Sequence, residues 1–378
     1  SRISKKKLET FSVMFENKEY DESKNQKIMS NFLGTRHNSI LIKNNDIYDN
    51  FSNAVNHAET FLFRTAPIPM YLLSKLVNKN GHKVVFSGEG ADEVMLGYDI
   101  FSELKIRKFW SRNPNSNIRG NLFLKLYGYL PQFKNSRYAK LSIDFFKSFL
   151  SKKKDIFFSH TVRWSQFDYL KNYFINKNFD SDILIKKFKH NLEKEISKIG
   201  DLNKAQIIEF ETLLANYLLS TQGDKMSMAH SVETRVPYLD DDFVEFISKC
   251  NPKLFLQGVK GKHIFRKAYK GILPKEIIDA PKIAYQAPEA KVFFNKQRPK
   301  ELVFDFMSFI KKNKFLDYKM YDHLIQKILN TDENYRVSFR ENFAFIIGIS
   351  YFCLIENSKN WTFKKNKSIN KKININLI

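Results

Sequence analysis

The chain has 378 residues, of which 43% are hydrophobic and 15% aromatic, and this composition excludes a protein that is disordered over most of its length. Its 63 Lys and Arg against 40 Asp and Glu give a net charge of +23, with the lysines spread along the whole chain. This spread favours a solvated basic surface over a dedicated nucleic-acid or membrane-binding face, so we expect no nucleic acid and no membrane among the partners.

Strands and helices are expected to alternate over the first part of the chain. The apolar patterns predict strands at residues 10–15, 38–42 and 83–88 and helices at residues 22–33, 54–63 and 70–77. This alternation predicts an α/β fold with a parallel, doubly wound sheet. Ligands of such a sheet gather beyond the carboxyl ends of the strands.

The remainder of the chain is expected to be mainly helical. The clearest helix is predicted at residues 205–219, and the longest apolar stretch, residues 342–355, predicts a buried helix because it is shorter than the roughly 18 residues of a membrane span. We expect three parts, which cover residues 1–100 (α/β), 101–360 (helical) and 361–378 (a basic low-complexity tail). The two cysteines, Cys250 and Cys353, have neither disulfide nor metal-site spacing, which is typical of a reduced cytoplasmic protein.

The stretch FSGEGADEV, residues 86–94, places a glycine turn and several carboxylates directly after a predicted strand. Ser87 and Gly88 can present backbone amides to a ligand, while Glu89, Asp92 and Glu93 repel one another unless a cation or an amine lies among them. One interpretation is therefore a site for Mg²⁺ with a phosphate, or for an amine. The other is a solvated turn whose acidic side chains stabilise the start of a helix.

Two later stretches also combine charge with loop signals. In residues 220–246, Asp224, Lys225, Glu233 and Arg235 alternate in sign, which is compatible with an ion-pair lattice or with a polar wall of a pocket. In residues 260–290, Lys282 follows a proline on a loop. A lysine about 4 Å from a phosphate gains about 4 kcal/mol in a poorly solvated site but about 1 kcal/mol in water.

Together, these stretches resemble the synthetase domain of the glutamine-hydrolysing asparagine synthetases. The resemblance rests on SGEGADE, on GDKMSMAHSVETRVPYLD, and on RKAYKGILPKEI with the Pro-Lys that follows, and it covers most of residues 8–290. It implies an ATP pyrophosphatase fold with a nucleotide-binding part over residues 1–100. It also implies an ATP- and Mg²⁺-dependent reaction in which aspartate is adenylated on its side chain and ammonia then displaces AMP.

The resemblance also implies roles for particular residues. Val13 corresponds to the position that meets adenine, Ser87 and Gly88 face the nucleotide, and Asp92 helps to hold Mg²⁺. Glu89 receives or positions the proton of the incoming amine, and Lys282 balances charge on the pyrophosphate and the reacting centre.

The remaining implied roles and one departure concern other stretches. Substrate positioning is implied for Asp224, Lys225, Glu233 and Arg235. The arginine that precedes the family's lysine is replaced by Ala280, so one positive charge is missing from that loop in the sequence.

Two parts of the family pattern are not found in the sequence. The phosphate-cradling loop SGGxDS is absent, and so is the N-terminal cysteine nucleophile of the glutaminase half, since the chain begins with Ser1. We therefore expect a carboxyl portion of a longer chain that is inactive alone. Its partners would be aspartate and ammonia, the latter from a glutaminase domain outside this chain, and a homodimer is compatible with the resemblance.

Two other functions remain open from the sequence. A related amidotransferase or a β-lactam synthetase-like ligase would act on another carboxylate, and comparing carboxylates in AMP release would separate it from the aspartate enzyme. A non-catalytic basic binding protein would instead show binding that weakens steeply with salt.

Overall fold

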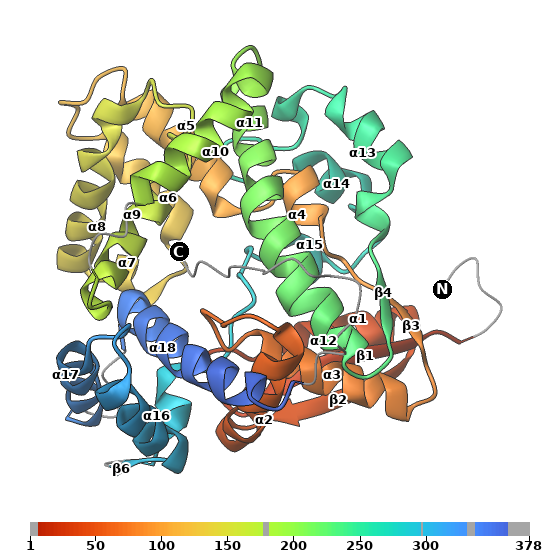
Figure 1. Ribbon diagram of the computed structural model, residues 1–378. Coiled ribbons are helices and arrows are strands. Elements are labelled where there is room, and N and C mark those ends of the chain that lie inside the picture. Colours follow the sequence, from red (N-terminus) through yellow and green to blue (C-terminus); the bar gives the residue numbers. More distant parts are fainter. Residues whose placement is uncertain (1–6, 177–180, 296–297, 331–336, 362–378) are drawn as a thin grey trace, which may run out of the picture.

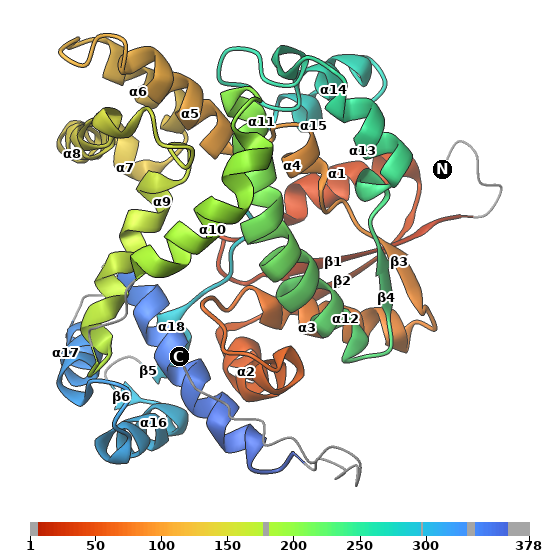
Figure 2. The ribbon, with the colours of Figure 1, turned by 45° about the horizontal axis from the view of Figure 1, so that its top comes forward.

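The computed structural model describes residues 7–176, 181–295, 298–330 and 337–361. The two parallel strand pairs and their helices lie on one side of the molecule, and most of the other helices lie on the opposite side and above them (Figure 1). The helix that runs from α11 (Asp201–Glu209) through the π-helical segment η4 (Phe210–Asp224) to α12 (Lys225–Met228) passes through the centre, drawn in green (Figures 1 and 2).

The first strand pair is a parallel β-α-β unit. Strand β1 (Glu9–Phe15) pairs with β2 (Arg36–Ile42) from Glu9 opposite Arg36 to Phe15 opposite Ile42. Helix α1 (Ser23–Leu33) connects them and ends at Gly34, whose φ of 64° is the left-handed conformation that glycine adopts without strain. The sequence-based strands at 10–15 and 38–42 and the helix at 22–33 are confirmed.

The second strand pair joins two distant stretches of sequence. Strand β3 (Val84–Phe86) pairs in parallel with β4 (Glu233–Arg235), so the acidic turn and the GDKMSMAHSVETR stretch lie side by side. Helix α3 (Pro67–Lys79) precedes β3 and packs on β1 (Figure 2). A third pair, β5 (Phe294–Asn295) with β6 (Arg298–Pro299), is antiparallel.

The described strands therefore form separate pairs and not one continuous doubly wound sheet. Among the described residues, β1 and β3 are not paired through their backbones. Side chains connect them instead: the rings of Phe11 and His82 lie 5.4 Å apart, edge to face, and His82 Nε2 is 3.3 Å from Glu9 Oε2. The coarse α/β class is confirmed, with helices making up most of the described structure.

Helices account for the rest of the described regular structure. The remaining α-helices are α2 (Asn44–Ala58), α4 (Ala91–Val94), α5 (Asp99–Trp110), α6 (Leu122–Tyr127), α7 (Pro131–Lys134), α8 (Ser136–Ser148), α9 (Thr161–Ser165), α10 (Ser181–Ile196), α13 (Asp241–Ser248), α14 (His263–Ala268), α15 (Lys275–Asp279), α16 (Glu301–Lys312), α17 (Tyr318–Leu329) and α18 (Phe339–Ser358). Short 3-10 segments are η1 (Arg119–Asn121), η2 (Leu150–Lys152), η3 (Gln166–Tyr173), η5 (Pro237–Leu239), η6 (Pro252–Leu254) and η7 (Ala290–Phe293).

One helix prediction was displaced along the chain. Helix α2 begins at Asn44 and ends at Ala58, whereas the apolar pattern placed a helix at residues 54–63. Its start is fixed by the Asp46 carboxylate, which accepts a hydrogen bond from the Lys43 N–H at 2.7 Å. Its end is fixed at Glu59, which has a left-handed φ of 53°. Backbone capping, which the apolar pattern does not report, therefore sets both ends.

The carboxyl-terminal helix α18 closes the main core. Its buried residues pack with those of β1, α2 and α3 in one hydrophobic cluster that extends along the chain from Val13 to Cys353. Ser350 Oγ accepts a hydrogen bond from the Leu62 N–H at 2.8 Å, so α18 is tied to the segment that follows α2. The buried helix predicted at residues 342–355 is confirmed, and no helix among the described residues is long and apolar enough to cross a membrane.

Candidate functional site

The acidic turn begins where β3 ends. The Ser87 N–H donates a hydrogen bond to the Arg235 carbonyl oxygen at 2.8 Å, and Gly88 is exposed with open space around it. Gly90 has a φ of 85°, and a Cβ there would lie 2.3 Å from Leu239 Cδ2, so both conformation and space require glycine. The chain then enters α4, which carries Asp92 on its first turn.

Asp92 lies between two lysines. Its Oδ1 is 2.9 Å from Lys262 Nζ and its Oδ2 is 3.2 Å from Lys282 Nζ. Burial alone would raise the pKa of Asp92, but the ammonium groups of Lys282 and Lys262 outweigh burial and hold that pKa below its ordinary value. Asp92 is therefore a charged carboxylate with a cation at each oxygen.

Lys282 also acts on further carboxylates around it. Burial raises the pKa of Glu22, Glu89 and Asp99, and the positive charge of Lys282 opposes that rise in each case. Lys282 itself is on the irregular connection between α15 and η7, with its Nζ 5.4 Å from the centre of the Tyr98 ring. The structure thus brings Glu89, Asp92 and Lys282 into one place.

Glu93 is the fully buried carboxylate of the turn. Its side chain has no solvent exposure, and burial raises its pKa to about 7. Tyr98 is its polar neighbour, and the phenol pKa is raised, first by burial and then by the charge of Glu93. Glu93 and Tyr98 therefore form a poorly solvated wall behind Asp92.

Val13 lines a cavity of about 310 Å³ next to this cluster. The other lining residues come from the loop before α1, from α1 itself, and from the connection that carries Lys282, and they include Glu22, Gln26 and Tyr285. Gln26 Nε2 donates a hydrogen bond to the Val13 carbonyl oxygen at 2.9 Å. The cavity therefore lies at the carboxyl end of β1.

A larger groove of about 1290 Å³ opens on the other side of Lys282. Asp99 and Tyr129 line it, with the Tyr129 hydroxyl donating to Asp99 Oδ2 at 2.7 Å. Residues of the stretch 257–282 form the opposite wall. The cluster of Lys282 and its carboxylates therefore lies between the cavity lined by Val13 and this larger groove.

The four residues expected to position substrate are in two places. Glu233 and Arg235 form an ion pair with 2.7 Å between Oε1 and Nε on β4, beside Ser87. Lys225 is the first residue of α12, and its side chain instead reaches the end of α2, where its Nζ is 3.3 Å from Glu59 Oε2; Asp224 next to it is exposed. The structure brings the first two to the acidic turn and gives Lys225 a partner on α2.

Sequence reasoning assigned no site role to Lys262 or Arg266. Arg266 Nη1 donates to the Ala280 carbonyl oxygen at 3.1 Å, so a guanidinium lies on the loop where Ala280 replaces the family's arginine. Lys262 follows Gly261, where a Cβ would lie 2.2 Å from the Leu96 carbonyl oxygen, so the two backbone segments can meet only at a glycine. Such a close backbone approach is not apparent from composition or spacing.

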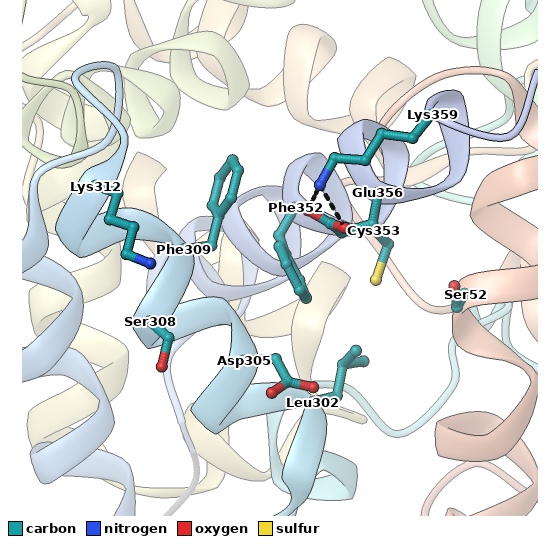
Figure 3. Close-up of a pocket in the computed structure, with 10 residues that line it drawn as sticks. All are labelled: Ser52, Leu302, Asp305, Ser308, Phe309, Lys312, Phe352, Cys353, Glu356 and Lys359. Carbon is teal, nitrogen blue, oxygen red and sulfur yellow. Dashed lines mark hydrogen bonds and ion pairs between the residues drawn. The ribbon is translucent and has the colours of Figure 1, made fainter.

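A separate pocket of about 600 Å³ lies away from this cluster, between α2, α16 and α18 (Figure 3). Phe309 and Phe352 form part of its wall, and an ion pair joins Glu356 to Lys359 at 2.6 Å. Cys353 also lines this pocket (Figure 3). None of the residues proposed from the sequence for the site lines it.

Comparison with known proteins supports the sequence resemblance. The chain matches the asparagine synthase family over residues 1–344. The chain belongs to the asparagine synthase family. It is 29% identical over 295 residues to asparagine synthetase [glutamine-hydrolyzing] 1 of Bacillus subtilis, a match that covers 74% of this chain and 42% of that protein.

Other relatives carry a different name. Amidase chyE of Penicillium rubens is 25% identical over 306 residues, which cover 74% of this chain and 44% of that protein. Amidase chry2 of Gibberella zeae is 24% identical over 300 residues, which cover 74% of this chain and 43% of that protein. The chain thus spans less than half the length of each of these three relatives.

Proposed function

We propose that this chain is the amide-forming part of a glutamine-hydrolysing asparagine synthetase. The proposed reaction joins aspartate and ammonia at the expense of ATP through a β-aspartyl-AMP intermediate, with pyrophosphate and AMP as products. The observation that carries the proposal is the meeting of Asp92, Glu89 and Lys282 at the end of β3, within a chain of the asparagine synthase family.

The carboxylates of the turn suit a magnesium ion that arrives with the nucleotide. No group of three or more His, Cys, Asp or Glu among the described residues could hold a metal by itself. However, Mg²⁺ commonly takes one or two carboxylates together with substrate phosphates. Asp92 would hold it, and the next side chain of the turn is the buried carboxylate of Glu93. The bound ion would neutralise charge on the phosphates.

Lys282 is proposed to stabilise the reacting phosphate. It is partly shielded from water, where a charge interaction over about 4 Å is worth roughly 4 kcal/mol against about 1 kcal/mol in water. In the reaction, the aspartate side-chain carboxylate attacks the α-phosphorus and the bond to pyrophosphate breaks. A fixed ammonium group that meets the charge of the leaving pyrophosphate lowers the barrier of this step.

Glu89 is proposed to take the proton of the amine. Ammonia attacks the acyl carbon of the adenylate, the bond to AMP breaks, and a proton must leave the new ammonium group. Because burial raises the pKa of Glu89, the carboxylate holds a proton more readily at neutral pH than an exposed glutamate does. Val13 and its cavity would receive the adenine ring, with Ser87 and Gly88 facing the phosphates.

The two parallel strand pairs are proposed to belong to one doubly wound sheet of the ATP pyrophosphatase type. In the described residues, β1 and β3 have no backbone partner on the sides that Phe11 and His82 span. A strand with the phosphate loop, from sequence outside these 378 residues, would pair with both edges. The glutaminase domain that supplies ammonia would likewise lie outside this chain.

The test is AMP release from ATP with aspartate and ammonia in the natural protein that contains this chain. Lys282→Ala and Asp92→Ala should each lower turnover by about a hundredfold or more, since each removes a charged group at the reacting centre. Lys253→Ala, an exposed lysine on η6, is the control and should leave turnover unchanged. Wild-type turnover in Lys282→Ala would refute the proposal.

The relatives named amidases favour a second candidate, an amide-forming ligase that acts on a different carboxylate. The same assay separates the two candidates. AMP release that aspartate does not stimulate, but that another carboxylic acid does, would favour the second.

A further inference from the structure

Lys262 reaches Asp92 from a strained segment of the backbone. Lys262 has a φ of 54°, and Leu96, in the segment that packs against it, has a φ of 53°. The Lys262 N–H donates to the Met95 carbonyl oxygen at 3.1 Å, which joins the two segments. Left-handed conformations are strained for residues other than glycine, and they are found preferentially at functional sites.

Glycines clear the path of the Lys262 side chain. A Cβ on Gly97 would lie 2.8 Å from Lys262 Cε and 2.0 Å from Asp92 Oδ1. A Cβ on Gly261 would lie 2.2 Å from the Leu96 carbonyl oxygen. Both glycines and both strained residues therefore contribute to one contact, that between Lys262 Nζ and Asp92 Oδ1.

The two lysines at Asp92 are held differently. Lys262 is at the N-terminal boundary of α14, and the next residue, His263, donates its N–H to the Phe255 carbonyl oxygen at 2.8 Å. Lys282 is on an irregular connection, is slightly further from its carboxylate oxygen, and interacts with several other carboxylates. Lys262 is thus the fixed partner of Asp92, and Lys282 is the partner that can exchange.

We propose that Lys262 is a positioning residue, which holds Asp92 by Oδ1 so that Oδ2 is turned toward an incoming divalent cation when Lys282 moves to the phosphates. This inference rests on the proposed function of the site. It adds to that function a residue that acts through Asp92 and does not itself touch the substrate. The strained backbone is the means by which the Lys262 ammonium group is brought to that oxygen.

The test measures cation binding without turnover, in the natural protein that contains this chain. Mn²⁺ is titrated in the presence of ATP and without aspartate, and free Mn²⁺ is followed by electron paramagnetic resonance. Lys262→Met should raise the Kd for Mn²⁺ by about tenfold or more, as loss of a group that orients a metal ligand does. Gly97→Ala should do the same, because the added methyl group would displace both Asp92 Oδ1 and the Lys262 side chain and so break their contact although both residues remain.

Matched variants separate positioning from general damage to the fold. Lys262→Arg keeps the charge and should recover part of the affinity, while Lys253→Met, an exposed lysine on η6, should bind Mn²⁺ as the wild type does. In AMP release, Lys262→Met should lower kcat and raise the Mg²⁺ concentration at half-maximal rate, with the KM for the carboxylate substrate unchanged. Circular dichroism shows whether each variant is folded.

The outcomes are distinct. Wild-type Mn²⁺ affinity in folded Lys262→Met or Gly97→Ala overturns the inference, and so does a wild-type protein that binds no Mn²⁺ with ATP. If Mn²⁺ affinity depends on Lys262 but no carboxylate stimulates AMP release, the proposed reaction fails while the positioning role stands.

Discussion

At the scale of single residues, burial brings the ionisation of Glu93 close to neutral pH. Burial raises its pKa from 4.5 to about 7. The folded chain therefore binds this proton more tightly than the unfolded chain does. The free energy of unfolding then falls as pH rises from 4.5 to about 7, by an amount on the order of 3 kcal/mol from this residue.

Glu93→Gln should remove this pH dependence. The variant has no proton to lose at this position, so its free energy of unfolding relative to the wild type should increase from pH 5 to pH 8. Chemical denaturation at a series of pH values measures both curves. If the two curves run parallel across this range, Glu93 does not titrate as described.

Cys353 illustrates how burial makes a thiol unreactive. It is 2% exposed in α18, and burial raises its pKa to about 12. Because the thiolate is the reacting form, Cys353 should react with a disulfide reagent only when the chain unfolds, while the half-buried Cys250 reacts in the folded protein. Titration with the reagent before and after denaturation counts the thiols. Rapid reaction in folded Cys250→Ser would contradict this prediction.

At the scale of elements, the packing of α18 against α17 depends on one glycine. A Cβ on Gly348 would lie 2.5 Å from ring atoms of Tyr321, whose hydroxyl donates to the Ala344 carbonyl oxygen at 3.1 Å. Tyr321 is fully buried, so its ring has little room to move. The helices can approach this closely only because residue 348 has no side chain.

Gly348→Ala should therefore destabilise the protein even though alanine favours helices. Overpacking costs about 1–3 kcal/mol, which exceeds the gain in helix propensity of at most about 1 kcal/mol. Urea denaturation measures the difference. Gly200→Ala is the control, because its Cβ would be 3.6 Å from the nearest atom, and it should have little effect. A stabilised Gly348→Ala would show that α17 and α18 can separate at this point.

At the scale of the whole molecule, the amino-terminal strands and the carboxyl-terminal helices share one core. The cluster that contains Val13 and Phe51 also contains Phe345 and Cys353. The boundary at residue 100 between an α/β part and a helical part remains a prediction from the sequence pattern. The shared core implies that the first part cannot bury its apolar face without α18.

A chain that ends at residue 337 should for this reason fail to fold. It lacks α18 and exposes the apolar side chains of α2 and η7 that pack on this helix. A chain that ends at Trp361 keeps α18 and is the control. Thermal unfolding followed by circular dichroism should give a cooperative transition for the control alone. A cooperative transition in the shorter chain would show that its core is independent of α18.

Local patterns predicted much of the fold. The strands at residues 10–15 and 38–42 were predicted correctly because the spacing of apolar residues and the content of β-branched residues favour a strand within a few residues of sequence. The helix expected at 205–219 is present but continues in π geometry to Asp224, which the apolar stripe did not indicate. The ends of α2 are set by capping at Asp46 and Glu59. The predicted ends were displaced from them because capping hydrogen bonds and left-handed residues leave only weak signals in the sequence.

The site was partly predictable, because short motifs identify chemical groups but do not report which distant groups meet. Motifs predicted site roles for the acidic turn and Lys282, and the structure places these residues close together. Lys225 was grouped with Arg235 because the two are close in sequence, yet its ammonium group lies at the end of α2. Nearness along the chain is a poor guide to nearness in space once a turn intervenes.

By itself, the sequence determined the alternation of elements, the family to which the chain belongs and the set of charged residues available to the site. The tertiary structure alone decided which cations meet Asp92. That choice depends on two left-handed residues and two glycines that bring separate segments together. Backbone dihedral angles and clearances of a few tenths of an ångström between distant segments result from packing, and no local pattern of residues encodes them.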